Sequence, residues 1–178
     1  RGLALCGFDE SKPVLMVIGG SLGASSVNKT VRDNLDALLQ KFQIVHLCGK
    51  DKMDNLLLTR PGYRQFEYVK EDLKDLYAMA DIVLSRAGAN AICELLALKK
   101  PNLLVPLPTG RGDQKLNAAS FEAQGYSIVV QDDDLPDVIL EKISELYEHR
   151  DQYISAMEKS SQTDSNHLVL SLIEQEAK

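Results

Sequence analysis

Hydrophobic positions along the chain alternate between short continuous runs and helical spacing. Residues 14–18 are apolar without interruption and end in a glycine-rich turn, which is typical of a strand buried on both faces of a parallel sheet. Apolar residues then recur every three or four positions, which predicts a helix over 25–41. The same reasoning predicts further strands over 44–48, 63–69, 81–85, 102–106 and 127–130. It predicts further helices over 72–80, 88–98, 117–124, 136–149, 151–160 and 167–176.

This order of elements predicts the fold class. Strands that alternate with helices through short connections form right-handed crossovers and a parallel sheet. We therefore expect an α/β fold with a doubly wound, Rossmann-like parallel sheet of about six strands. The strand at 63–69 is more polar than the others, which indicates an edge position. Because there is no internal repeat or low-complexity linker, we expect residues 1–178 to form a single domain.

Composition narrows the class of protein. Hydrophobic residues are 44% of the 178 positions and charged residues 26%, as in ordinary globular domains. No apolar run approaches the roughly 20 residues that cross a bilayer as a helix. Lysine and arginine number 20 and aspartate and glutamate 26, so the formal net charge is −6. This acidic balance, without a basic stripe, argues against a nucleic-acid partner.

Cysteine, histidine and aspartate positions give no pattern of metal ligands. Cys6, Cys48 and Cys93 lie far apart without a C-x-x-C pair, so we expect small core residues rather than a metal or redox site. The three histidines are equally scattered. The aspartate run at 132–134 is expected to be a solvated turn that caps the following helix.

The candidate ligand-binding segments lie where predicted strands end, because open parallel sheets bind ligands beyond the carboxyl ends of their strands. The first candidate is the glycine-rich turn at 19–24, where backbone N–H groups and the Ser21 hydroxyl can approach a ligand. The turn is not a full G-x-G-x-x-G, and no acidic residue ends the second strand, which argues against a dinucleotide site. A tight turn without any ligand is the alternative interpretation.

The second candidate is the small-residue turn and helix start at 85–94. The first turn of that helix, from Gly88 to Ala91, would present N–H groups and the positive end of the helix dipole to a phosphate. Glu94 lies on the same helix face as Asn90 and Ala91 and can accept two hydrogen bonds from a ribose diol. This arrangement fits a nucleoside diphosphate, but the pattern alone does not favour it over the alternative, a solvent-facing Glu94 on a helix that only packs.

The third candidate is the loop at 106–112 with the helix start that follows it. Asp113, Gln114 and Asn117 share one helical turn and combine carboxylate with amide groups, which suits sugar hydroxyls. The alternative is that Asp113 only caps the helix.

Together these segments resemble the MurG family of glycosyltransferases. The matching segments stand in the order and spacing of that family and cover nearly the whole chain: 19–24, 48–50, 76–81, 85–94 and 113–118. Members transfer N-acetylglucosamine from UDP-N-acetylglucosamine to lipid I, forming lipid II in peptidoglycan synthesis. The resemblance is to the C-terminal, donor-binding half of a GT-B enzyme, and it implies that the N-terminal acceptor domain is absent from this chain.

The resemblance implies roles for single residues in binding the nucleotide. The uracil edge should pair with the backbone at Val69 and Lys70, and Glu94 should hold the ribose hydroxyls. Ser21 and its turn should face the nucleotide sugar. The diphosphate should bind the backbone of four consecutive residues, which are Gly88, Ala89, Asn90 and Ala91.

The resemblance also implies contacts to the sugar. N-acetylglucosamine hydroxyls should meet Asp113, Gln114 and Asn117, whereas Arg86 should order its turn rather than touch substrate. Many members carry a hydroxyl residue at the position of Ala91, which here has no such group. The helix N–H groups would therefore make the phosphate contact alone.

The implied reaction is inverting: an acceptor hydroxyl attacks the anomeric carbon, and UDP leaves as N–H donors stabilise its charge. It requires no metal and no cofactor. The catalytic group that activates the acceptor is expected in the N-terminal domain, so this chain should be soluble and bind donor without turnover. The full-length protein would lie peripherally on the cytoplasmic face of the bacterial membrane. Two alternatives stay open, a UDP-N-acetylglucosamine epimerase-like domain and a non-catalytic nucleotide-binding module.

Overall fold

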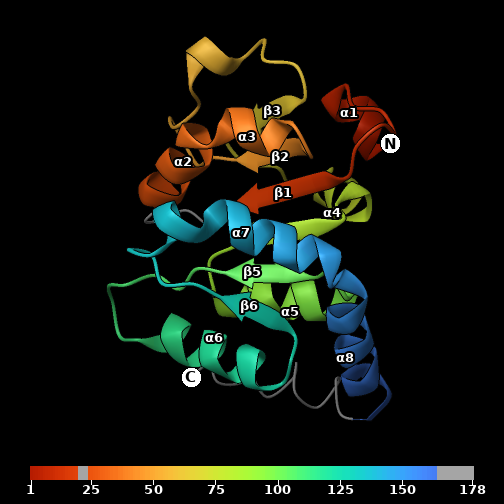
Figure 1. The fold of residues 1–178 in the computed structure, drawn as a ribbon, viewed down its shortest axis with the longest axis vertical. Helices are drawn as coiled ribbons and strands as arrows, with labels where there is room; N and C mark the ends of the chain where they lie inside the picture. Colours follow the sequence, from red (N-terminus) through yellow and green to blue (C-terminus); the bar gives the residue numbers. More distant parts are fainter. Residues whose placement is uncertain (20–23, 164–178) are drawn as a thin grey trace.

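A six-stranded parallel sheet forms the centre of the computed structural model, which describes residues 1–19 and 24–163 (Figure 1). The strand order is β3-β2-β1-β4-β5-β6: the chain adds β2 and β3 on one side of β1 and then crosses back to add β4, β5 and β6 on the other side, which places the switch point of the sheet between β1 and β4. This order confirms the doubly wound α/β prediction and the edge position of β3. The strands are β1 (Val14–Ile18), β2 (Gln43–Leu47), β3 (Tyr63–Phe66), β4 (Ile82–Ser85), β5 (Asn102–Leu104) and β6 (Ser127–Val129).

Helices cover both faces of the sheet (Figure 1). One core lies between the sheet and three helices, which are α2 (Ala24–Asp33), α3 (Leu35–Leu39) and α7 (Leu135–Glu148). The other core includes residues of α1 (Gly2–Cys6), α4 (Leu73–Met79), α5 (Ala89–Leu98), α6 (Asp113–Ala123) and α8 (Arg150–Thr163). No helix within the described residues has both the length and the hydropathy required to cross a membrane.

Two-sided burial explains the continuous apolar runs of the strands. In β1, Leu15 and Val17 belong to the core under α2 and α7, whereas Val14 and Met16 belong to the opposite core. Successive side chains of a strand point to opposite faces, so a strand that is covered on both faces needs apolar residues at every position. All three cysteines are also buried, which confirms that they are core residues.

Several element boundaries differ from the sequence prediction. The helix expected over 25–41 is two helices, α2 and α3. The helix is interrupted at Asn34, whose side-chain Nδ2 donates to the carbonyl oxygen of Thr30 at 2.8 Å. Helix α6 begins at Asp113 rather than 117, directly after Gly112, whose φ of 84° ends the loop. Helix α1 and the 3₁₀ turn η1 (Asn55–Leu57) were not predicted. The helix expected over 167–176 lies outside the described residues.

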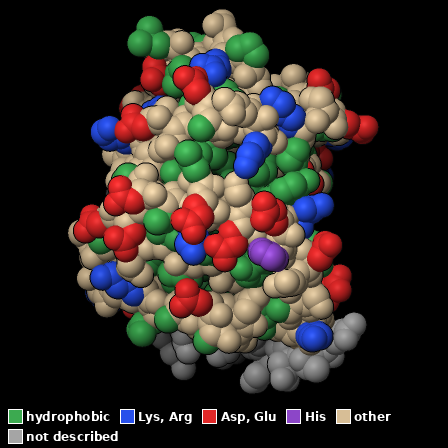
Figure 2. All heavy atoms as spheres, viewed as in Figure 1, with side chains coloured by type: hydrophobic (Ala, Val, Ile, Leu, Met, Phe, Trp, Pro, Cys, Tyr) green, Lys and Arg blue, Asp and Glu red, His purple; other side chains and the backbone are tan. Residues whose placement is uncertain are grey.

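Acidic side chains gather over α7 on the face shown in Figure 2. The exposed carboxylates of this region come from the loop before α7 and from α7 itself: Asp133, Asp134, Asp137, Glu141 and Glu148. Leu135, Ile139 and Ile143 point the other way, into the core. Helix α7 therefore presents an apolar stripe to the sheet and negative charge to solvent.

Candidate functional site

The carboxyl ends of β1 and β2 and the loop after β3 border a cavity of about 390 Å³. Ile18 and Leu47 end their strands in its wall, and helices α4 and α5 close the other side. The cavity brings together three of the residues singled out from the sequence, which are Val69, Ala91 and Glu94. A mostly apolar wall with a few polar groups is the usual construction of a site for a small organic ligand.

The backbone at Val69 lies in the wall of this cavity. Among the described residues, neither its N–H nor its C=O takes part in a hydrogen bond, although Val69 is half-buried in the cavity wall. Nearby groups are already used: the Glu67 carbonyl accepts from Gly49 N–H at 2.9 Å and the Lys70 carbonyl from Leu73 N–H at 3.3 Å. A half-buried donor and acceptor without partners suit the edge of a heterocycle. Lys70 is exposed and does not line the cavity.

Helix α5 starts beside the cavity with uncapped N–H groups. Gly88 is its N-cap residue and has no side chain to cap the helix, and the first helical bond is donated by Ile92 to Gly88 at 3.0 Å. The N–H groups of Ala89, Asn90 and Ala91 therefore have no acceptor within the helix. Ala91 lines the cavity, so this positive helix end lies next to the carboxyl ends of the strands.

Glu94 is held by a neighbouring helix. Its Oε2 accepts a hydrogen bond of 3.0 Å from the hydroxyl of Tyr77, which stands on α4 and also lines the cavity. Burial, followed by the negative charge of Glu94, raises the pKa of the Tyr77 phenol well above its usual range. The hydroxyl therefore stays protonated and donates at neutral pH. The second oxygen of the exposed Glu94 carboxylate accepts no hydrogen bond from the described residues.

The first turn of α6 is attached to the turn that precedes α5. Gln114 Oε1 accepts from the N–H groups of Ala87 at 3.2 Å and Leu107 at 2.9 Å, and Asn117 Nδ2 donates to the Ala87 carbonyl at 3.0 Å. These amides shape the α5 entry, a role that the sequence did not suggest. Gln114 Nε2 donates no hydrogen bond to the described residues, and it would lie 3.8 Å from a methyl group added at Gly88. Asp113 is exposed at the start of the same helix.

Arg86, which the resemblance implied would order its own turn, instead connects the segments that follow β5 and β6 to α2. Its buried guanidinium donates from Nη1 to the Val105 carbonyl at 3.2 Å and to Asp132 Oδ1 at 2.7 Å, and from Nη2 to Ser26 Oγ at 3.0 Å. The prediction for Asp132 was wrong, because this carboxylate forms a buried ion pair instead of a solvated cap. Asp134 is the N-cap residue of α7, and its side chain makes no cap bond.

Some cavity residues were missed from the sequence. Lys50 and Glu67 line the cavity on the β2 and β3 side, and Tyr77 lines it from α4. Lys50 and Tyr77 lie in segments that carried the family resemblance, but nothing in their spacing showed that they meet one ligand site. Ser21 lies outside the described residues.

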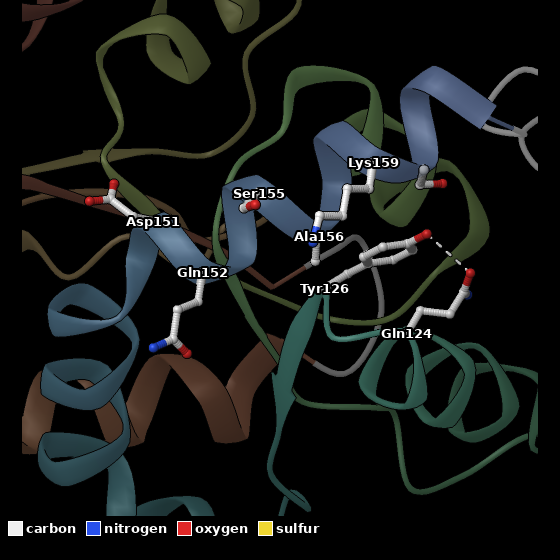
Figure 3. Close-up of a pocket in the computed structure, with 8 residues that line it drawn as sticks. Gln124, Tyr126, Asp151, Gln152, Ser155, Ala156 and Lys159 are labelled. Atoms are coloured by element: carbon white, nitrogen blue, oxygen red, sulfur yellow. Dashed lines mark hydrogen bonds between the residues drawn. The ribbon is translucent and has the colours of Figure 1, made fainter.

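A second hollow of about 850 Å³ contains none of the predicted site residues (Figure 3). It lies between α8 and the turn from α6 to β6, where the Tyr126 hydroxyl donates to Gln124 Oε1 at 3.1 Å. Tyr126 directly precedes β6, so this hollow is at the amino ends of the strands. Within residues 1–19 and 24–163, no three His, Cys, Asp or Glu side chains are grouped to hold a metal ion.

The fold is that of one half of a GT-B glycosyltransferase. Residues 14–171 match the family model described as the glycosyltransferase family 28 C-terminal domain. The chain therefore belongs to glycosyltransferase family 28, and the resemblance to MurG is confirmed.

Named relatives of high sequence identity support this family assignment. A UDP-N-acetylglucosamine–N-acetylmuramyl-(pentapeptide) pyrophosphoryl-undecaprenol N-acetylglucosamine transferase of Lachnospira eligens is 55% identical, over 99% of this chain and 51% of its own length. The transferase of the same name from Clostridium botulinum strain Hall is 52% identical, over 100% of this chain and 51% of its own. The chain thus spans about half the length of the curated relatives it matches.

Solved structures share the fold at low sequence identity. A crystal structure of Acinetobacter baumannii MurG aligns with a TM-score of 0.72 and 23% identity, covering 97% of this chain and 53% of that one. The glycosyltransferase VinC, solved in complex with dTDP, aligns with a TM-score of 0.67 and 17% identity, covering 96% and 44% of the two chains.

Proposed function

We propose that this chain is the donor-binding half of an inverting glycosyltransferase that moves N-acetylglucosamine from UDP-N-acetylglucosamine to lipid I, forming lipid II. One observation carries the proposal: a single cavity joins the free peptide edge of Val69 and the carboxylate of Glu94 at the uncapped N-terminus of α5. These groups match a pyrimidine edge, a ribose diol and a diphosphate, respectively.

The N-terminus of α5 stabilises the leaving group of the proposed reaction. When an acceptor hydroxyl attacks the anomeric carbon, the bond to the diphosphate breaks and its electron pair stays on the leaving UDP. The N–H groups of Ala89 to Ala91 are fixed before this charge develops, so they stabilise it without reorganisation. Gln114 and Asn117 support them by holding the Ala87 backbone, and Gln114 Nε2 and Asp113 are left to contact the sugar.

The acceptor side belongs to the remainder of the full-length protein. The names of the relatives, at 52–55% identity, support a transferase over an epimerase or a purely regulatory module. Because one substrate is a nucleotide sugar and the other a membrane lipid, we place the full-length protein peripherally on the cytoplasmic face of the bacterial membrane. Activation of the acceptor hydroxyl is assigned to the other half, so this chain binds donor without turnover.

Titration calorimetry with three nucleotide sugars tests the proposal. UDP-N-acetylglucosamine should bind more tightly than UDP-glucose, because the N-acetyl group adds contacts, and both should bind at least about tenfold more tightly than ADP-glucose, whose base cannot reproduce the Val69 pairing. Equal affinity for the uridine and adenosine ligands would contradict the base assignment. Equal affinity for the two UDP-sugars would contradict the choice of donor.

A further inference from the structure

Tyr77 is a core residue that also lines the proposed donor cavity, which is the cavity lined by Val69 and Glu94. Its side chain is 3% exposed and packs in the core between the sheet and α4 and α5, yet its hydroxyl emerges beside Glu94. The 3.0 Å bond to Glu94 Oε2 is the one hydrogen bond that this hydroxyl makes among the described residues. A buried ring with a single polar contact at the edge of a site is a rigid support for the group it contacts.

Glu94 needs such support because it is exposed. A free glutamate side chain samples many rotamers, and a ligand that selects one of them loses affinity for the ordering. The Tyr77 bond joins two helices at positions 17 residues apart, so it fixes the carboxylate relative to α4 as well as α5. It also occupies one oxygen and leaves the other, which has no partner among the described residues, able to accept a hydrogen bond from a ligand in the cavity that Glu94 lines.

We propose that Tyr77 is a positioning residue of the donor site: it orients the Glu94 carboxylate so that the unoccupied oxygen accepts a hydrogen bond from the ribose diol. The inference rests on the proposed donor site. It assigns Tyr77 no contact with the reacting atoms, and its effect should depend on the presence of both Glu94 and the diol.

The Tyr77→Phe variant tests this inference, because it removes the hydroxyl and keeps the ring in the core. Affinity should be measured by calorimetry for UDP and for 2′,3′-dideoxyuridine 5′-diphosphate, which lacks the diol. We expect Tyr77→Phe to weaken UDP about three- to tenfold and to leave the dideoxy ligand within about 1.5-fold, the size of one hydrogen bond that is lost indirectly. In a Glu94→Ala background, which leaves Tyr77 no carboxylate to orient, the same change should have no further effect on UDP.

Tyr126→Phe is the matched control. Tyr126 is 4% exposed in the same core, and its hydroxyl bonds to Gln124, far from the cavity at the other end of the strands. This variant should bind both ligands as the unmodified chain does. It reports any general effect of removing a buried tyrosine hydroxyl.

Two results would overturn the positioning role. Equal weakening of both ligands by Tyr77→Phe would mean that Tyr77 supports the cavity or the base directly, and unchanged UDP affinity would mean that Glu94 needs no orientation. Failure of the donor proposal looks different. In that case the unmodified chain itself would bind neither ligand, or bind both equally, and the diol would have no role.

Discussion

His46 in the middle of β2 is fully buried, with both ring nitrogens close to polar groups. Nε2 lies 2.8 Å from Asn28 Oδ1 and Nδ1 lies 2.6 Å from the Tyr63 hydroxyl. Because the Asn28 amide donates from Nδ2 to the Cys48 carbonyl, its Oδ1 accepts, so the proton of a neutral His46 is on Nε2. Nδ1 then accepts from Tyr63. Burial, followed by the positive charge of Arg32, lowers the pKa of His46 from 6.5 to about 3.

This shift predicts a loss of stability in weak acid. The pKa of His46 is lower in the folded than in the unfolded chain, so the unfolded chain takes up the proton first as the pH falls. The stabilisation is complete above pH 6.5 and is lost progressively towards about pH 3. We expect the free energy of unfolding to fall by about 2 kcal/mol between pH 6.5 and 5, measured by urea denaturation.

Two histidine variants isolate the source of this pH dependence. His46→Gln keeps a donor and an acceptor in the core and should flatten the dependence between pH 6.5 and 5. His149→Gln, on an exposed residue at the end of α7, should keep it. A His46→Gln variant that shows the full original slope would contradict this assignment.

At the scale of elements, Arg86 and Asp132 connect the end of β4 to the loop after β6 and to α2, neither of which is paired with β4 in the sheet. Arg86 follows β4, and its guanidinium contacts the residue after β5, the loop after β6 and the first turn of α2. The Arg86 and Asp132 side chains are 6% and 13% exposed, so the pair is largely removed from water. Such a pair fixes geometry, and breaking it leaves a buried charge without its counter-ion.

Asp132→Ala should therefore lower the free energy of unfolding by about 3–5 kcal/mol, measured by chemical denaturation at pH 7. Asp133→Ala removes a neighbouring carboxylate that is exposed, and it should change the same quantity by about 0.5 kcal/mol or less. Similar small effects for both variants would show that Arg86 is adequately satisfied by its other partners.

The elements also show what the sequence could and could not predict. Burial on both faces requires continuous apolar runs, so the central strands could be predicted from the sequence, as could the helix start at Gly88. The break at Asn34 was not, because the helical spacing of apolar residues continues across it and a local amide bond decides it. The Arg86–Asp132 pair spans 46 residues, and no local pattern encodes such a contact. Gln114 was selected for its amide, but its backbone partners exist only in the fold.

At the scale of the whole molecule, the polar groups described above lie in three places, which are the two ends of the parallel strands and the outer face of α7. The cavity proposed for the donor lies at the carboxyl ends of the strands, the hollow of Figure 3 lies at the amino ends, and the carboxylates of Figure 2 cover α7. Under the proposed function, the acceptor would reach the sugar from the carboxyl ends of the strands. We therefore expect the other half of the full-length protein to face these strand ends.

The pairing of β1 with β4 has a consequence for the order of folding. The Val14 N–H donates to Asp81 Oδ2 at 2.7 Å across 67 residues of chain, and Leu15 pairs with Ile82 in register. Such distant segments meet later than local helices and the β2–β3 pair, because a long loop must close first. The cavity needs Ile18 from β1 and Glu94 from the helix after β4, so it cannot exist before this closure. After dilution from urea, far-ultraviolet circular dichroism should therefore recover before binding of a fluorescent UDP analogue, and simultaneous recovery would indicate that the whole sheet assembles in one step.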